Sequence, residues 1–81
     1  QAVMLTKTGC GFCVRAKEAM HAAGIAFVEM NLPNATRGVV VGALAGHGTV
    51  PQLFVNGALV GGSDAIIAWA QTHGNKEATN A

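Results

Sequence analysis

The chain has 81 residues, of which 51% are hydrophobic and 11% are charged. This length supports one small hydrophobic core, and the composition excludes a disordered chain. The formal net charge of +1 gives no reason to expect binding to nucleic acid or to an acidic membrane surface. We expect one domain over residues 1–74, followed by a C-terminal tail over 75–81.

The pattern of apolar residues predicts seven elements in the order βαβαββα. We expect strands at 3–6, 26–30, 50–55 and 58–60, and helices at 11–23, 35–45 and 64–72. Strands that alternate with helices are typical of an α/β domain with parallel strand pairs.

The segment 35–45 has the most ambiguous pattern of the seven. Three consecutive valines at 39–41 favour a strand, and the glycines on either side of them weaken a helix. We predict a helix, because Asn34 can cap it and a crossover between parallel strands usually needs one. Val40, Val41 and Leu44 would then share one face of this helix.

Turn signals are strongest near the C-terminal end. The pair Asn56-Gly57 between two apolar runs is typical of a tight type I′ hairpin, which needs positive φ angles at both residues. The glycines at 61–62 would end the second strand of the hairpin, and Ser63 would cap the last helix.

Two cysteines lie between the first predicted strand and the first predicted helix. Backbone N–H groups at a helix start lack partners and the helix dipole is positive there, so a thiolate is favoured. Helical spacing places Cys13 toward the core, while Cys10 precedes the helix and is expected to be exposed. A C-x-x-C in this setting predicts a thiol–disulfide redox site. Lys7, Arg15 and Lys17 add positive charge, although the last two are also explained as solvated helix charges.

Other uses of the cysteines fit the sequence less well. A loop of three residues restricts the unfolded chain little, so the pair is not a disulfide scaffold. Structural zinc needs four ligands, and the histidines at 21, 47 and 73 lack the paired spacing of a zinc finger.

Targeting signals are absent from the sequence pattern. The chain shows no signal-peptide pattern, and its longest apolar stretch, 38–46, is half the length of a membrane span. We therefore expect a cytoplasmic location. The start at Gln1 fits a trimmed protein and an excised domain equally well.

Four blocks of the sequence resemble the glutaredoxins, the small glutathione-dependent members of the thioredoxin fold. They are T-K-T-G-C-G-F-C (6–13), R-A-K (15–17), T-V-P (49–51) and G-G-S-D (61–64). The resemblance extends over residues 3–73. It implies a thioredoxin fold, with a four-stranded mixed sheet and three helices on its two faces. It also implies a monomeric oxidoreductase whose partners are glutathione and glutathionylated or disulfide-containing proteins.

The resemblance implies a catalytic pair and a glutathione site. Cys10 would attack as the thiolate and Cys13 would resolve the adduct. The implied glutathione-binding residues are Lys7, Phe12, Arg37, Thr49, Val50, Pro51, Gly62, Ser63 and Asp64. The peptide bond before Pro51 would be cis, and the Val50 backbone would pair with the cysteinyl unit of glutathione like an added strand.

Several of these residues have two explanations. Ser63 and Asp64 would hold the γ-glutamyl end, because a helix N-terminus binds a carboxylate and Asp64 an ammonium, but both also suit simple capping. Lys7 and Arg37 would bind the glycyl carboxylate, and Arg37 is also an ordinary surface arginine. Phe12 would either form a wall of the site or fill the core.

Three positions depart from the family pattern. Gly11 replaces the usual proline between the cysteines, Phe12 replaces the usual tyrosine, and Ala65 replaces a second acid. Gly11 supports an alternative hypothesis, because relatives with glycine there include carriers of a [2Fe–2S] cluster shared by two chains and two glutathiones. Cys10 would then be a cluster ligand and the protein a dimer. Dedicated carriers have serine in place of Cys13. A third hypothesis is a redoxin that accepts electrons from thioredoxin reductase.

Overall fold

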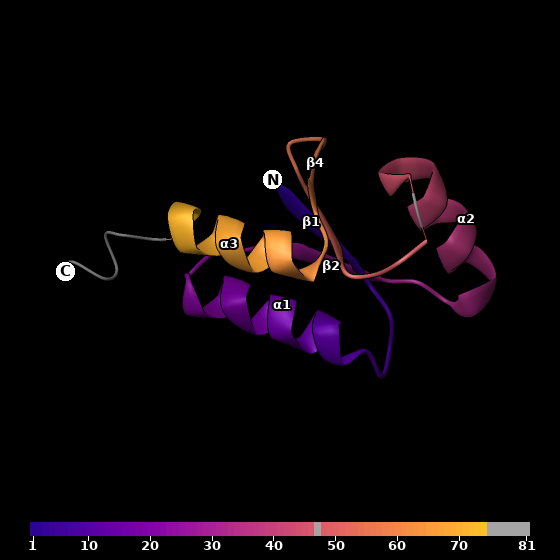
Figure 1. The fold of residues 1–81 in the computed structure, drawn as a ribbon, viewed down its shortest axis with the longest axis horizontal. Coiled ribbons are helices and arrows are strands. Elements are labelled where there is room, and N and C mark those ends of the chain that lie inside the picture. The colour runs from indigo at the N-terminus through magenta and orange to yellow at the C-terminus, as the bar shows by residue number, and fades with distance from the viewer. Residues whose placement is uncertain (47, 75–81) are drawn as a thin grey trace.

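The computed structural model describes residues 1–46 and 48–74, and these form one mixed sheet and three helices (Figure 1). The elements are β1 (Ala2–Thr6), α1 (Gly11–Ala22), β2 (Val28–Asn31), α2 (Asn34–Ala45), β3 (Gln52–Val55), β4 (Ala58–Gly61) and α3 (Ser63–His73). The strand order is β2-β1-β3-β4, with β1 and β2 parallel and the other neighbours antiparallel. The predicted βαβαββα order and thioredoxin fold are confirmed. The predicted tail, 75–81, lies outside the described residues.

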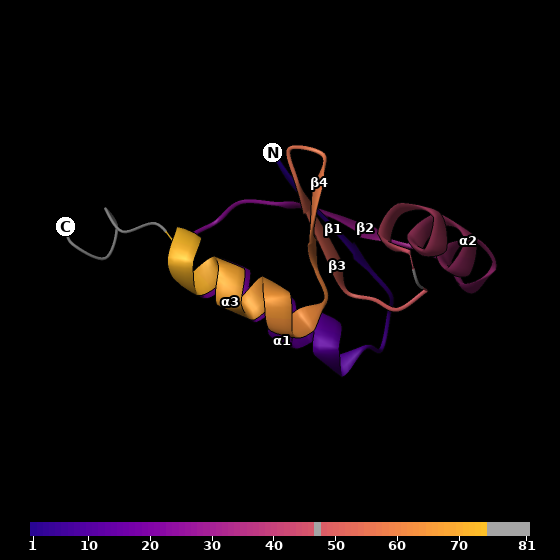
Figure 2. The same ribbon diagram turned by 45° about the horizontal axis from the view of Figure 1, so that its top comes forward.

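Helices α1 and α3 lie side by side against one face of the sheet. Helix α2 lies apart from them, on the other side of the strands (Figures 1 and 2). The core between the sheet and the α1–α3 pair is built from apolar side chains that recur at strand and helix spacing. Its buried members are Ala2, Met4, Ala16, Met20, Leu53, Ile66 and Ala70. This core joins the two helices that begin at Gly11 and Ser63, so it fixes the two N-termini relative to each other.

Helix α2 packs against the chain through a narrow stripe. Val41 is fully buried, whereas Val39 is 73% exposed and Leu44, which was expected to share a face with Val41, is 55% exposed. The predicted cap is also displaced by one residue. The helix begins at Asn34, and Pro33 occupies the cap position with an extended backbone. Within the described residues, no helix is long and apolar enough to cross a membrane.

The remaining boundaries differ from prediction by one to two residues. Strand β2 begins at Val28 because Ala26 and Phe27 still belong to the irregular connection after α1, and β3 begins at Gln52 because a cis peptide precedes it. The hairpin turn is confirmed, since Asn56 and Gly57 have φ angles of 51° and 85°.

Candidate active site

Cys10 caps the first helix with its own side chain. It follows the loop after β1 and adopts extended backbone angles, which is the usual conformation at an N-cap. Its Sγ accepts a hydrogen bond from the backbone N–H of Cys13 at 3.2 Å. The sulfur therefore lies where the unpaired amides of α1 favour negative charge.

The surroundings of Cys10 lower the pKa of its thiol. Burial alone raises this pKa, but hydrogen bonds from the side chain and backbone of Cys13, then from the backbone of Phe12, more than offset that effect. The charge of Lys7 lowers the pKa further. Both predicted causes, the helix start and Lys7, thus act in the expected direction.

Cys13 has the opposite electrostatic character. Its side chain lies in the core-facing stripe of α1, as predicted, and burial together with the hydrogen bond to Cys10 raises the pKa of its thiol to about 11. The backbone N–H of Lys7 and the charge of Lys17 only partly counter this shift. At neutral pH the second thiol therefore keeps its proton, whereas the first loses its proton more readily than an ordinary cysteine does.

The expected exposure of Cys10 is wrong, because the residue is only 8% exposed. The segment before β3 covers it: the thiol of Cys10 donates to the backbone oxygen of Val50 across 3.8 Å, a long contact even for sulfur. The Val50–Pro51 bond is cis, as the resemblance implied, and Pro51 is buried. The Val50 backbone consequently lies directly beside the reactive sulfur.

Gln52 holds this segment through contacts with Thr49, and no motif in the sequence singles it out. Its side chain is buried, and its amide nitrogen donates to the Thr49 backbone oxygen at 3.0 Å and to the Thr49 hydroxyl at 3.4 Å. The amide oxygen of Gln52 is buried without a hydrogen-bond partner. Burying the amide oxygen without a partner costs free energy. This cost indicates that the hydrogen bonds of the amide nitrogen to Thr49 are needed to hold the segment in place.

A polar groove of about 350 Å³ opens on one side of the cysteine loop. Lys7 lines it from the loop and Arg37 from α2, so the structure brings the two predicted carboxylate ligands to one cavity. The other lining residues are Thr8, Gly9, Asn31, Leu32 and Pro33. A guanidinium and an ammonium on one groove make it suitable for an anion.

The start of α3 lies next to the Val50–Pro51 segment. A side-chain carbon placed on Gly62 would lie 3.7 Å from the Pro51 backbone oxygen, in ordinary contact. Gly62, not Ser63, holds the cap position, and no side chain caps this helix, so the prediction that Ser63 is the cap is wrong. Ser63 and Asp64 instead occupy the first turn, where the N–H groups have no side-chain partner from the cap.

Phe12 projects from the first turn of α1 and is 59% exposed. The core-filling explanation of this residue is therefore wrong, because the ring contributes nothing to the buried cluster. An exposed aromatic ring two residues from the reactive thiol is available to a docking partner.

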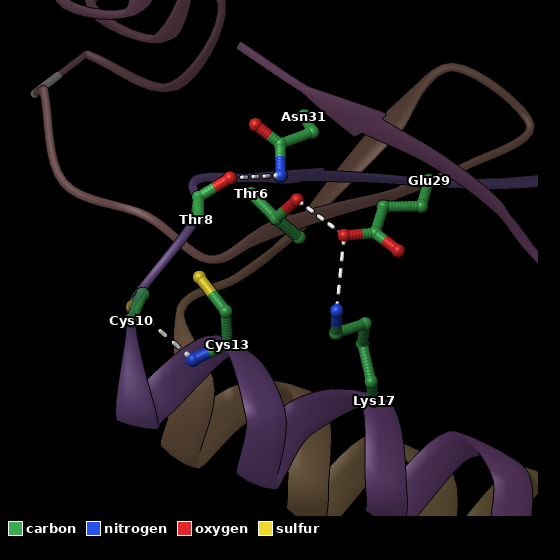
Figure 3. A network of polar contacts seen from close by, with 7 residues as sticks. All are labelled: Thr6, Thr8, Cys10, Cys13, Lys17, Glu29 and Asn31. Atoms are coloured by element: carbon green, nitrogen blue, oxygen red, sulfur yellow. Dashed lines mark hydrogen bonds and ion pairs between the residues drawn. The ribbon is translucent and has the colours of Figure 1, made fainter. Parts of the chain in front are cut away.

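A polar network that no sequence motif indicates lies beside the cysteines (Figure 3). One carboxylate oxygen of Glu29 accepts from the Thr6 hydroxyl at 2.6 Å and from Lys17 Nζ at 3.0 Å. These two hydrogen bonds, in that order of importance, lower the pKa of the Glu29 carboxyl. Only the parallel pairing of β1 with β2, which places Thr6 beside Asn31 and Met4 beside Glu29, brings these residues together.

The described residues do not fit a metal centre formed within one chain. Residues 1–46 and 48–74 contain no group of three or more histidine, cysteine or acidic side chains that could hold an ion. Cys13 is a poor ligand because it is buried and retains its proton. A cluster would therefore need most of its ligands from outside the chain.

Two thiols one helical turn apart, one acidified and the other held protonated, are suited to exchange with disulfides. With the sheet order and the cis-proline beside them, they define a domain of the thioredoxin fold that carries a C-x-x-C thiol pair. The profile of the family described as Glutaredoxin matches residues 2–60. The chain belongs to the glutaredoxin family.

Individual relatives agree with this assignment. The chain is 44% identical over 63 residues to the hybrid peroxiredoxin hyPrx5 of Haemophilus influenzae, a match that covers 78% of this chain but 26% of that protein. It is 34% identical over 64 residues to glutaredoxin 3 of Escherichia coli, covering 78% of this chain and 77% of that protein. The structure of a buckwheat glutaredoxin–glutathione complex superposes with a TM-score of 0.76 at 25% identity, over 88% of this chain and 68% of that chain.

Proposed function

We propose that this chain reduces protein–glutathione mixed disulfides and disulfides, with glutathione as the electron donor. The Cys10 thiolate attacks the glutathione sulfur of the mixed disulfide, the S–S bond breaks, and the protein thiolate leaves and takes up a proton. A second glutathione then attacks the Cys10 adduct and departs as glutathione disulfide. Alternatively, Cys13 attacks Cys10 and releases the bound glutathione.

The observation that carries this proposal is the hydrogen bond from the Cys13 backbone N–H to Cys10 Sγ at 3.2 Å, which favours negative charge on the first thiol. Attack requires a thiolate, and the lowered pKa of Cys10 favours one. The pKa of about 11 at Cys13 keeps that thiol in reserve until a disulfide on Cys10 is within its reach. The roles of nucleophile and resolving thiol follow from these two environments.

Glutathione suits the surfaces on both sides of Cys10. The groove with Lys7 and Arg37 offers two cations to the glycyl carboxylate. The Val50 backbone is available to the cysteinyl unit, and the first turn of α3 offers N–H groups and Asp64 to the zwitterionic γ-glutamyl end. The buckwheat relative in complex with glutathione supports the same choice of ligand.

The test is an assay of mixed-disulfide reduction with glutathione and glutathione reductase, on the wild type and the variants Cys10→Ser and Cys13→Ser. We expect turnover to survive the loss of Cys13 and to disappear with Cys10. Equal losses in the two variants would contradict the division of roles. A wild type without turnover would contradict glutathione dependence.

We also propose a peroxiredoxin as the protein partner, because the hybrid peroxiredoxin is 44% identical to this chain over the matched region. A peroxidatic cysteine oxidised to sulfenic acid condenses with glutathione and loses water to form a mixed disulfide, the substrate class above. A glutathionylated peroxiredoxin should be reduced with a lower KM than an unrelated glutathionylated protein. Equal KM values would contradict this partner.

The [2Fe–2S] hypothesis stays a prediction. A side-chain carbon at Gly11 would meet nothing within 4 Å, so the loop beside Cys10 has open space. Anaerobic reconstitution with iron, sulfide and glutathione tests the hypothesis directly. A colourless monomer after that treatment would contradict it.

A further inference from the structure

The Thr6–Glu29–Lys17 network has a geometry that stability alone does not explain. Lys17 Nζ lies 3.0 Å from Glu29 Oε2, but both side chains are about one-third exposed, and ion pairs of that kind stabilise a fold only slightly. The same carboxylate oxygen is held by Thr6, which is fully buried at the end of β1. The acceptor is thus fixed to the sheet, and it fixes the direction in which Lys17 points.

Lys17 follows Cys13 by four residues, so the two side chains project from the same face of α1. Figure 3 shows both rising from the helix toward β1, the sulfur toward Thr6 and Thr8 and the ammonium toward Glu29. Three groups shift the pKa of Cys13 through hydrogen bonds or charge. These are Cys10, the backbone N–H of Lys7 and the charge of Lys17. Among them Lys17 is the one side-chain cation.

We propose that Lys17, held in place by Glu29 and Thr6, is a positioning residue that stabilises the negative charge developing on Cys13 when this thiol closes the disulfide with Cys10. This inference rests on the proposed function, since it concerns the second, intramolecular step of that reaction. Lys17 thereby sets how often the glutathione adduct on Cys10 is resolved by Cys13 and how often by a second glutathione.

The step is a simple exchange. The Cys13 sulfur forms a bond with Cys10 Sγ, the bond between Cys10 and the glutathione sulfur breaks, and glutathione leaves as the thiol after taking up the proton of Cys13. Loss of a nearby cation makes the Cys13 thiolate rarer but also more nucleophilic. A tenfold fall in thiolate is therefore partly offset, and the net slowing is about threefold.

The experiment mixes reduced protein with excess glutathione disulfide, quenches with acid at millisecond intervals, and measures the Cys10 adduct and the Cys10–Cys13 disulfide by mass spectrometry. The variants are Lys17→Met, the conservative Lys17→Arg, and Arg15→Met, which removes the same charge from an exposed position on the same helix. The urea unfolding midpoint of each variant is measured alongside.

We expect Lys17→Met to close the disulfide about threefold more slowly, with adduct formation unchanged, while Lys17→Arg and Arg15→Met close at the wild-type rate. Closure at the wild-type rate in Lys17→Met would overturn the inference. Equal slowing in Arg15→Met would also overturn it, because the slowing would then follow from the loss of any positive charge on α1. A wild type that forms no adduct would instead refute the proposed function, so the two failures are distinguishable.

Discussion

The backbone N–H of Cys13 donates to the sulfur of Cys10 across 3.2 Å, so the residue that would resolve the adduct also stabilises the thiolate that would create it. This contact stabilises charge on Cys10, and the hydrogen bond between the two side chains disfavours charge on Cys13. The pKa values of two identical side chains are thereby moved in opposite directions within a single helical turn.

Alkylation kinetics test the acidity of Cys10. In the Cys13→Ser variant, the pH midpoint of iodoacetamide alkylation should lie below that of an ordinary cysteine, about 8.5. Lys7→Gln should raise this midpoint, because the Lys7 charge lowers the pKa of Cys10. Arg37→Gln is the matched control, since Arg37 is not among the groups that shift this pKa. A midpoint unaffected by Lys7→Gln would contradict the electrostatic argument.

Replacing Gln52 with methionine should separate positioning from stability. The variant loses both hydrogen bonds to Thr49 but also removes the buried unpaired oxygen, so the unfolding free energy should change by less than about 1 kcal/mol. The Thr49–Pro51 segment would be held less firmly, and we expect the KM for a glutathione mixed disulfide to rise about threefold to tenfold. An unchanged KM at reduced stability would show that Gln52 serves only the fold.

Gly61→Ala should destabilise the fold and disturb the start of α3. Gly61 has a φ of 136°, and an added Cβ would lie 2.8 Å from that of Ala65, so a cost of about 1–3 kcal/mol is expected. Gly42→Ala, inside α2 with open space around it, is the control and should stabilise by roughly 0.5–1 kcal/mol. Urea denaturation of both variants gives the comparison, and equal effects would contradict it.

Phe12→Ala should weaken the docking of protein substrates with little effect on the fold. The exposed ring makes little contribution to the core, so the unfolding free energy should stay within about 0.5 kcal/mol of the wild type. Burying the ring against a partner contributes about 1 kcal/mol, which predicts an approximately fivefold higher KM for a glutathionylated protein. A small glutathione mixed disulfide provides the control substrate. If its KM changed equally, the ring would belong to the glutathione site.

The raised pKa of Cys13 predicts a loss of stability at high pH. The unfolded chain releases this proton near pH 8.5 and the folded chain near pH 11, so the stabilisation present below pH 8.5 is lost progressively as the pH rises to 11. Comparing Cys10→Ser with Cys10→Ser/Cys13→Ala isolates the effect from Cys10, whose lowered pKa acts in the opposite sense. The variant that keeps Cys13 should lose more stability between pH 8 and 10.5. Parallel denaturation curves would contradict this assignment.

The sequence predicted the elements well because their signals are local. Helical spacing placed Cys13, Ala16 and Met20 in the core, and Asn56-Gly57 specified the hairpin turn. Boundaries near Pro51 and Ser63 were less predictable, since the cis peptide and the contact of Gly62 with Pro51 depend on tertiary packing.

Within the site, the errors share one cause. Cys10 looked exposed because it precedes a helix, but the Val50 segment, 40 residues later, covers it. Gln52 and Glu29 belong to no motif. The contact of Gln52 with Thr49 depends on the bend at the cis peptide between them, and the contact of Glu29 with Lys17 depends on how α1 packs beside β2. Such relationships between distant residues leave no periodic signal in the chain.

The thin packing of α2 has a consequence for the groove. Val41 anchors this helix while Val39 and Leu44 face outward, so α2 has little buried surface to oppose local opening. Arg37 belongs to this helix, whereas Lys7 belongs to the loop braced by β1 and α1. One cation of the groove is therefore held by well-packed elements, whereas the position of the other depends on the equilibrium between docked and locally opened α2. An anion that contacts both cations would shift that equilibrium toward the docked state. Anion binding and the docking of α2 would therefore stabilise each other.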